Sequence, residues 1–463
     1  MEITNKSERL GTEPILPLLF KLSLPSIIAM MVQALYNVVD SIYVGRLSTN
    51  ALSALTLTFP VQIIIIGIAV GTGVGASSLI SRLLGKGNKE RAAVAAEHVL
   101  IISIIYGIIM ALVGHFASDK ILRLFLDDPE IITMGTEYIS IILLGSISLF
   151  FPIIANNILR GEGNTFVPML AMLTGAIINI ILDPFFIFGI GPFPAWGVKG
   201  AAIATVLARI ISGLFLSYIF FNDKNEIQVN FQNFKYDPSI LKSIYRVGFP
   251  AMIMQFLASI MLAGMNYILA FFSSTAIAAA GIYFRLQSFV FMPVFGLNQG
   301  YMPLVGYNFG HQKPERMKKA IKSTLLVSLS FTGLGFIIFQ LFPVQLITVF
   351  NSDPELIKIG STALKHISLA FPIMGPAFVA VATFQAIGRG WPSMLISLLR
   401  QIIILLPLMY LLGRYFGLNI LWFSFPISET LGNIVGGIWL YNILKKNFRR
   451  MRKVSSEPTN QVS

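Results

Sequence analysis

Long apolar segments alternate with short polar stretches along almost the whole chain. A helix needs roughly 20 mostly apolar residues to cross a membrane. Twelve segments reach that length, at 22–45, 51–82, 92–117, 131–159, 165–190, 197–221, 243–271, 276–307, 320–345, 356–387, 392–413 and 419–442. The pattern therefore predicts an all-α polytopic membrane protein with twelve transmembrane helices.

The second half of the chain repeats landmarks of the first half at a constant offset of 225 residues (310 − 85). The clearest pairs are Gly85 and Gly310, Asp128-Pro129-Glu130 and Asp353-Pro354-Glu355, and Thr205 and Thr430. Duplicated multi-span membrane proteins commonly bind their substrates between the two halves. We therefore predict two six-helix, pseudo-symmetric lobes at 1–221 and 239–443, joined by a polar linker at 222–238 and followed by a basic tail at 444–463.

The charge pattern orients the predicted spans. With an even number of spans both termini share one side, and Lys and Arg gather in the loops on that side. Because cytoplasmic loops retain Lys and Arg, both termini are predicted to be cytoplasmic, in a cell inner or plasma membrane. This bias accounts for the formal net charge of +13, and no aromatic-interleaved basic patch indicates nucleic-acid binding. Only 12% of the residues are charged, against about 25% in soluble proteins.

Two carboxyl groups stand out inside the predicted spans. Asp40 lies in the outer part of the first span, and Asp183 lies at a similar depth in the fifth. Tyr36 and Asn179 each precede one of these aspartates by a helical turn, and Thr205 reaches the same depth in the sixth span. Ionisable residues inside a membrane are costly and usually functional. These oxygen atoms suit H⁺, because neighbouring carboxylates can share a proton, and equally suit Na⁺.

A simpler interpretation is that each aspartate caps a helix near the outer interface. Two aspartates at matched depth, with polar neighbours on their own helix faces, favour an ion site instead. The second half lacks this pair, since Asp40 corresponds to Met265 and Asp183 to Leu408. The ion chemistry is therefore predicted to lie in the first lobe. Without cysteines, the chain can form no thiolate metal site.

A second set of side chains marks a possible substrate cavity. Gln33 and Asn37 share a face of the first span with the ion-site residues, and Gln255 and Ser259 lie one turn apart in the seventh. Flexible thioethers and aromatic rings can adapt to varied lipophilic cations. Spans seven and eight supply them at Met261, Met265, Met292 and Phe295. Such residues are also common as lipid-facing or core residues of membrane helices.

Several motifs together resemble the multidrug and toxic compound extrusion (MATE) family, in particular its bacterial MepA-type and DinF-like branches. They are LPSIIAMMVQALYNVVDSIYVGRL in the first span, GKGNKER after the second, LRGEGNTFVPM after the fourth, NIILDPFFIFG in the fifth and GAAIAT in the sixth. The resemblance implies two six-helix lobes around a central cleft, and antiport of a drug against H⁺ or Na⁺. It also implies an ion site at Asp40, Asn179, Asp183 and Thr205, with Tyr36 and Asn156 as weaker matches.

The leading hypothesis is thus a secondary active exporter of lipophilic organic cations, with no cofactor and no obligate protein partner. The alternative is a flippase for lipid-linked oligosaccharides, which would need a cationic cavity for phosphate groups. A membrane-embedded enzyme is disfavoured because the four histidines are scattered and no hydrolase motif occurs. The chain also lacks a P-loop, so ATP is not expected to drive transport.

Overall fold

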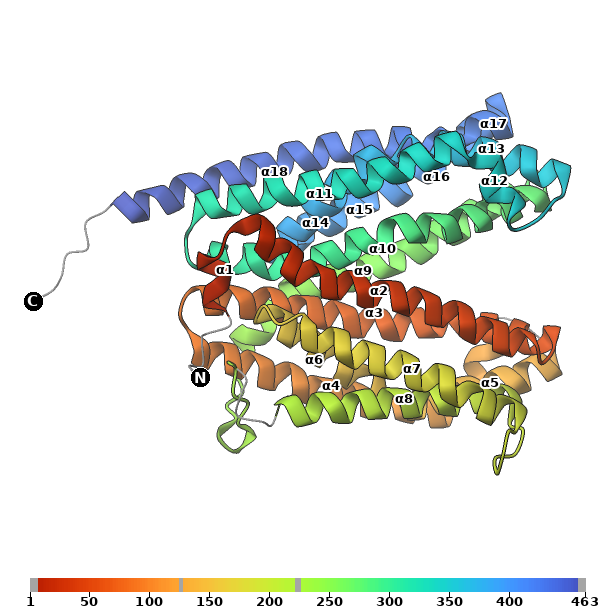
Figure 1. The fold of residues 1–463 in the computed structure, drawn as a ribbon, viewed down its shortest axis with the longest axis horizontal. Coiled ribbons are helices and arrows are strands. Elements are labelled where there is room, and N and C mark those ends of the chain that lie inside the picture. The colour runs from red at the N-terminus through yellow and green to blue at the C-terminus, as the bar shows by residue number, and fades with distance from the viewer. Residues whose placement is uncertain (1–6, 125–127, 221–225, 457–463) are drawn as a thin grey trace, which may run out of the picture.

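The chain forms a bundle of long helices that run roughly along one axis (Figure 1). The computed structural model describes residues 7–124, 128–220 and 226–456. The first half contains α1 (Glu8–Thr12), α2 (Ile15–Gly45), α3 (Thr49–Gly85), α4 (Lys89–Leu122), α5 (Pro129–Leu144), α6 (Ile147–Gly161), α7 (Phe166–Phe188) and α8 (Gly197–Phe220). Within the described ranges, all regular structure is helical.

The second half begins after a short 3-10 turn in the linker (Phe231–Asn233). It contains α9 (Pro238–Ala270), α10 (Ser274–Gly310), α11 (Pro314–Leu341), α12 (Pro343–Thr348), α13 (Pro354–Ser368), α14 (Phe371–Ala386), α15 (Gly390–Leu398), a π-helical stretch (Leu399–Ile404), α16 (Leu405–Phe416), α17 (Leu418–Leu421) and α18 (Ser424–Ser456). The predicted basic tail is therefore a helical continuation of α18 as far as residue 456.

These helices supply the predicted spans, with one difference in each half. Among the described residues, nine helices are long and apolar enough to cross a membrane, and two bent pairs provide one span each. The pairs are α5 with α6 and α13 with α14, bent by 51° and 52°. The twelfth predicted span lies largely in α18, which is not among these helices. The fourth and tenth predicted spans are therefore broken helices instead of continuous ones.

Local chemistry explains both breaks. The first falls at Gly145 and Ser146, a residue pair that commonly kinks a helix. The second falls just before Pro372, which cannot donate a backbone hydrogen bond and whose ring clashes with the preceding turn. The two breaks occupy equivalent places in the duplicated halves, so the bend belongs to the repeated unit.

The duplication extends to the ends of the helices. Ser48 caps α3 by accepting a hydrogen bond from the Ala51 backbone N–H, and Ser273 caps α10 by accepting one from Ala276, both at 3.0 Å. Gly163 and Gly388 have φ angles of +84° and +80°, which favour glycine because it lacks a Cβ. The repeat found in the sequence is therefore a repeat of structure.

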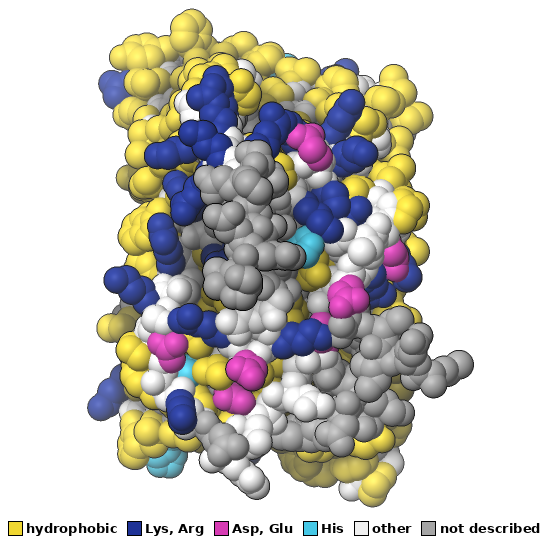
Figure 2. Space-filling view, turned by 90° about the vertical axis from the view of Figure 1, so that its left-hand side faces the viewer, with side chains coloured by type: hydrophobic (Ala, Val, Ile, Leu, Met, Phe, Trp, Pro, Cys, Tyr) yellow, Lys and Arg dark blue, Asp and Glu magenta, His cyan; other side chains and the backbone are white. Residues whose placement is uncertain are grey.

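The two halves share a core at only one end of the bundle. The largest apolar cluster joins residues of both halves, including Leu22, Ile158, Ile244 and Leu304. A second cluster lies within the first half, around Tyr138, and a third within the second half. In Figure 1 the halves meet at the end where α1 and the last turns of α18 lie, and they diverge towards the other end. We call the shared end the basic end, because many Lys and Arg side chains lie on it (Figure 2).

Close helix crossings hold the basic end together. A Cβ at Gly75 of α3 would collide with the backbone of α9 at Ile244 and Gly248. At the equivalent place in the second half, a Cβ at Gly300 of α10 would collide with Ser23 of α2. Small residues allow membrane helices to approach backbone to backbone, where van der Waals contacts and hydrogen bonds drive association.

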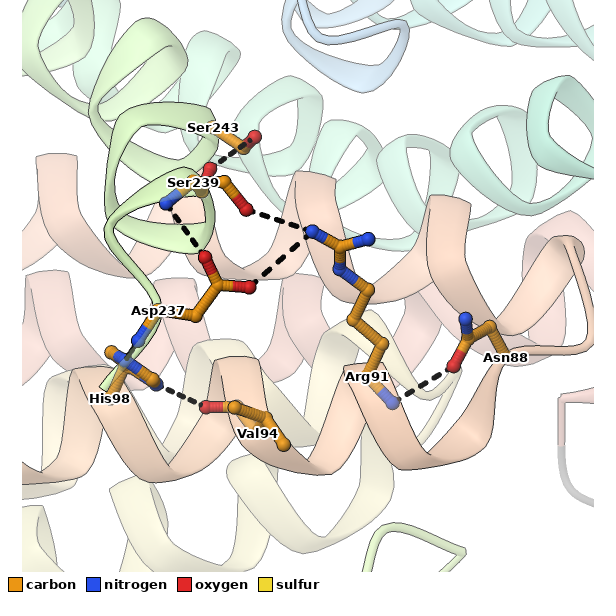
Figure 3. Close-up of polar contacts among 7 residues, drawn as sticks. All are labelled: Asn88, Arg91, Val94, His98, Asp237, Ser239 and Ser243. Carbon is orange, nitrogen blue, oxygen red and sulfur yellow. Dashed lines mark hydrogen bonds and ion pairs between the residues drawn. The ribbon is translucent and has the colours of Figure 1, made fainter. Parts of the chain in front are cut away.

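The linker between the halves is fixed to α4 by polar contacts (Figure 3). Asp237 caps α9 by accepting a hydrogen bond from the Ser239 backbone N–H at 2.8 Å, and it pairs with Arg91 at 3.4 Å. The backbone N–H of Asp237 donates to Nε2 of His98 at 2.9 Å, while Nδ1 of His98 lies 2.7 Å from the Val94 carbonyl oxygen. The linker thereby sets where α9 begins relative to the first half.

Candidate functional site

A cavity of about 720 Å³ lies between the two halves. Helices α2, α3, α6, α7 and α8 line it from the first half, and α9, α10, α14, α15 and the π-helical stretch do so from the second. Eight of the sequence-predicted site residues lie on its wall: Gln33, Tyr36, Asn156, Asn179, Thr205, Gln255, Met292 and Phe295. The volume is in the range of pockets that hold drug-sized molecules.

A cluster of buried oxygen atoms borders this cavity in the first half. The Asn179 amide donates to a carboxylate oxygen of Asp183 at 3.3 Å and lies 3.4 Å from the Thr205 hydroxyl. Asp183 is fully buried, and Asn179 and Thr205 are nearly so. The fifth and sixth spans thus bring these three side chains together. Asn179 and Thr205 face the cavity, which Asp183 does not line.

Asp40 belongs to the same neighbourhood. It interacts electrostatically with Asp183 across α2 and α7, and with Arg209 of α8. Tyr36, one turn before Asp40, interacts with the same arginine. Asp40 and Asp183 are thus near each other, as the matched depth predicted, and Arg209 is a cation that the sequence analysis missed.

Several oxygen atoms in this cluster are buried without a partner. Within the described part of the chain, one oxygen each of Asp40, Asp183 and Asn179 accepts no hydrogen bond. Buried polar atoms are almost always satisfied, so each of these needs a partner. A proton on either carboxyl, or a Na⁺ ion among the three oxygens, would supply one. The cluster therefore fits either ion chemically.

The remaining predicted cavity residues lie elsewhere. Met265 is 1% exposed and belongs to the apolar core of the second half, where Met261 packs against it. Ser259 donates to the Gln255 carbonyl oxygen of its own helix at 3.5 Å and does not line the cavity. The side chain of Asn37 lies outside the described residues. The position of Met261 and Met265 around the helix explains why the cavity prediction fails for them. They lie six and ten residues after Gln255, so their side chains turn toward the interior of the lobe.

The second half holds a buried ion pair that the sequence analysis did not anticipate. Arg400 lies in the π-helical stretch and donates to a Glu429 carboxylate oxygen of α18 at 2.7 Å. Its guanidinium lies 5.9 Å from the ring centroid of Phe378, and Ser428 donates to its backbone carbonyl. A buried carboxylate, and not a backbone carbonyl or the membrane interface, thus holds the Arg400 guanidinium. The sequence feature that could have revealed this pair is Glu429, a lone glutamate inside the twelfth predicted span.

Arg160 is a further missed residue. It lies at the end of α6, on the cavity wall, and is 8% exposed. Its Nη2 atom lies 3.4 Å from the sulfur of Met172. The predicted fourth span ends at residue 159, which placed Arg160 in a cytoplasmic loop. In the structure Arg160 lies on the cavity wall, one residue before the end of α6.

Comparison with known proteins agrees with this architecture. The MatE family model matches residues 25–185 and again residues 250–411, so the chain belongs to the MatE family. The two matches begin 225 residues apart (250 − 25), the offset of the internal repeat. Members of this family are transporters, so the chain is a multi-pass membrane transporter and not an enzyme. The predictions of the family and of the all-α, twelve-span, two-lobe fold are confirmed.

Two curated relatives show the range of the family. The FAD transporter of Shewanella oneidensis is 29% identical over 421 residues, which cover 91% of this chain and 93% of the relative. The multidrug export protein MepA of Staphylococcus aureus is 28% identical over 432 residues, which cover 92% and 94%.

Two solved structures are also similar along almost their whole length. An outward-facing multidrug resistance MATE family transporter has a TM-score of 0.91 at 28% identity, and the match covers 97% of this chain and 100% of that one. A transporter from Pyrococcus furiosus, described as having a binding pocket of reverse polarity, has a TM-score of 0.90 at 29% identity, with 96% and 99% covered.

Proposed function

We propose that this chain is an ion-coupled exporter that moves small organic compounds out of the cell in exchange for H⁺ or Na⁺. The observation that carries the proposal is the cluster of unsatisfied oxygens at Asp40, Asn179 and Asp183, which borders a drug-sized cavity between two repeated lobes. An ion bound there and a cargo bound in the cavity share Asn179 and Thr205 as wall residues. Occupancy at one site can therefore influence the other.

Coupling requires that ion and cargo favour different conformations. The closed core at the basic end and the divergence of the lobes at the other end define one such conformation. If the basic end faces the cytoplasm, as the Lys and Arg bias indicates, this state opens outward, both termini are cytoplasmic, and the membrane is the cell's inner or plasma membrane. An ion entering from outside would reach Asp40 and Asp183 in this state and favour return to the inward-facing one.

The charge of the cargo is a separate question. Relatives named for multidrug export and the methionines and phenylalanines of the second lobe support lipophilic organic cations. The relative named as an FAD transporter supports a wider range of cargo. No Asp or Glu is among the described residues on the cavity wall, whereas three arginines are. Organic cations therefore lack the complementary charge that their recognition would use there.

A flippase for lipid-linked oligosaccharides is the second candidate, and the three wall arginines are the observation that favours it. The volume of about 720 Å³ argues against a cargo of that size. Turnover of lipid-linked glycans in a deletion strain decides between the two, because a flippase is required for that turnover and an exporter is not.

The exporter is tested in proteoliposomes loaded with ethidium, riboflavin or flavin mononucleotide. We expect efflux of at least one of them to follow an imposed H⁺ or Na⁺ gradient, and the effective gradient identifies the ion. Asp40→Asn should abolish this dependence without changing the elution profile of the purified protein. Asp119→Asn is the matched control, because Asp119 pairs with Arg123 at an exposed site on α4. Equal gradient-driven efflux from wild type and Asp40→Asn would refute the proposed coupling site.

A further inference from the structure

The cavity wall carries a charge pattern that the ion site does not explain. Arginines reach it from three helical segments: Arg160 from α6, Arg209 from α8 and Arg400 from the π-helical stretch. The rest of the described wall is made of amides, hydroxyls, methionines, phenylalanines and other apolar residues. A wall with cations and without carboxylates attracts anions and repels cations, most strongly where water is excluded.

Two of these arginines have a carboxylate nearby. Arg400 is paired with Glu429 at 2.7 Å, and Arg209 interacts electrostatically with Asp40. Their charges are therefore largely balanced while both carboxylates are ionised. They shape the cavity without requiring a charged ligand.

Arg160 differs from the other two. In the described ranges its one polar side-chain contact is the sulfur of Met172, at 3.4 Å. Its Nε atom is buried without a hydrogen-bond partner, as one nitrogen of each of the other two arginines also is. Glu162, two residues further along, does not line the cavity. A buried guanidinium without a counter-charge is unfavourable, so its retention on a ligand-sized cavity indicates a partner that arrives with the ligand.

The surroundings of Arg160 suit an anionic group. Asn156 lies one turn before it on α6 and also faces the cavity. Asn157 lies on the same wall, and its amide donates to the Ile153 carbonyl oxygen at 2.8 Å. A guanidinium presents several N–H donors in a planar fork that matches the oxygens of a phosphate or a carboxylate.

The opposite wall suits the body of such a ligand. Phe295 and Phe378 meet edge to face, with ring centroids 5.0 Å apart, and both line the cavity from the second lobe. Met254, Met292 and Met302 surround them on the wall. Aromatic rings and thioethers make favourable contacts with flat apolar molecules.

We propose that the cavity takes an amphipathic organic anion, whose phosphate or carboxylate binds Arg160 and whose flat apolar part packs on the Phe295–Phe378 wall. This assignment rests on the proposed export function and narrows its cargo class. Cargo would bridge the lobes, with its charge on the first and its apolar part on the second. Arg160 would supply the counter-charge that distinguishes an anion from its neutral analogue.

Ligand pairs that differ only in the anionic group test this directly. Flavin mononucleotide and riboflavin share one ring system and differ by a phosphate, and ethidium serves as the cationic comparison. Binding is measured by equilibrium dialysis with the full-length protein in nanodiscs, without any ion gradient. We expect wild type to bind flavin mononucleotide at least about tenfold more tightly than riboflavin, the scale of one hydrogen-bonded charge. We expect the weakest binding for ethidium.

Variants then assign the preference to Arg160. Arg160→Gln should bring the two flavins to equal affinity, and Arg160→Lys should retain part of the preference because it keeps the charge. Arg285→Gln is the matched control, since Arg285 is exposed on α10 and does not line the cavity. Because both flavins are compared on the same protein, a loss of folded protein lowers the amount of each flavin bound and leaves the ratio of the two affinities interpretable.

The outcomes separate this inference from the proposed function. Equal binding of both flavins by wild type, or an unchanged preference in Arg160→Gln, overturns the anion site even if gradient-driven efflux of ethidium persists. A flavin mononucleotide preference that disappears in Arg160→Gln supports the site, even if no gradient drives efflux and the coupling proposal fails.

Discussion

At the scale of single residues, the Arg400–Glu429 ion pair affects the stability of the folded protein. Both side chains are at least 90% buried and lie 2.7 Å apart, so neither charge can be solvated if the other is removed. Breaking such a pair on one side typically costs about 3–5 kcal/mol, whereas replacing both partners by neutral residues costs much less.

We therefore expect Glu429→Gln to lower the melting temperature of the purified protein clearly, and Arg400→Met combined with Glu429→Gln to recover most of that loss. Asp119→Asn breaks the exposed Asp119–Arg123 pair and should change little. Thermal unfolding in detergent, followed by size-exclusion chromatography, measures all three variants. If the double variant is as unstable as the single one, the loss comes from packing and not from charge.

Asp237 provides a pH-dependent contact outside the membrane. Hydrogen bonds from the Ser239 hydroxyl and backbone N–H, and the nearby Arg91, hold the pKa of the Asp237 carboxyl below its usual value of 3.8. Since the folded pKa is lowered, the ionised carboxylate stabilises the linker contact at neutral pH, and this contribution is lost as the pH falls below about 3.8.

We expect limited proteolysis across pH 3 to 7, with an acid-active protease at the low end, to cleave the linker faster below about pH 3.8. Asp237→Ala should be cleaved faster already at neutral pH, and Asp237→Asn should be intermediate because asparagine still caps a helix. A cleavage rate that is independent of pH in wild type would show that this carboxylate does not hold the linker.

The sequence revealed some of these residues because a charge is rare in an apolar segment. Asp40 and Asp183 were found in this way, and the structure places them near each other. Arg209 and Glu429 are also charged residues in apolar segments. Their roles could not be predicted, because their partners lie on other helices. Arg160 was assigned to a loop because the end of a membrane helix cannot be located to one residue from hydrophobicity alone.

At the scale of helices, the glycines of α3 determine how closely the lobes approach. A side chain at Gly75 would meet the backbone of α9, which cannot move aside as a flexible side chain can. Overpacking of this kind costs about 1–3 kcal/mol. A larger side chain at this position would destabilise the conformation in which the basic end is closed, because α3 and α9 touch in that conformation.

Gly75→Val should therefore reduce the melting temperature and shift the protein away from this conformation. Gly333→Val on α11 is a matched control, because a Cβ at Gly333 meets nothing within 4 Å. Distances between spin labels placed across the basic end report the conformational shift. Identical distance distributions for the Gly75 and Gly333 variants would argue against a role for this crossing in closure.

The breaks between α5 and α6 and between α13 and α14 show the limit of prediction at this scale. Both parts of each broken span are apolar, so the hydrophobic pattern predicts one continuous helix. The cues were a Gly-Ser pair and Pro372, yet proline also occurs inside unbroken helices of this chain, as Pro25 does in α2. Whether such a residue bends or breaks a helix depends on the packing of its neighbours.

At the scale of the whole molecule, the internal repeat predicted two lobes with a site between them, and the structure has two lobes with a cavity between them. It could not predict which conformation the lobes adopt, since the same helices form every state of an alternating-access cycle. In the conformation seen here α1 also contributes to closure. Arg316 of α11 donates to the backbone carbonyls of Leu10 and Glu13 at 3.2 and 2.7 Å.

Transport must therefore separate contacts that are buried in this structure. Ser23 of α2 donates to the Leu297 carbonyl oxygen of α10 at 3.2 Å, within the shared core at the basic end and away from the cavity wall. Because the chain has no cysteine, Ser23→Cys combined with Leu297→Cys introduces a single thiol pair without background. Oxidation should join the lobes and stop gradient-driven efflux, and a reductant should restore it.

The control is Gln340→Cys with Ser368→Cys, whose native side chains lie 3.0 Å apart within one lobe. This pair should form a cross-link that leaves efflux intact. Full transport by a completely cross-linked Ser23–Leu297 variant would mean that the cargo crosses without opening the basic end, and alternating access would have to be abandoned for this protein.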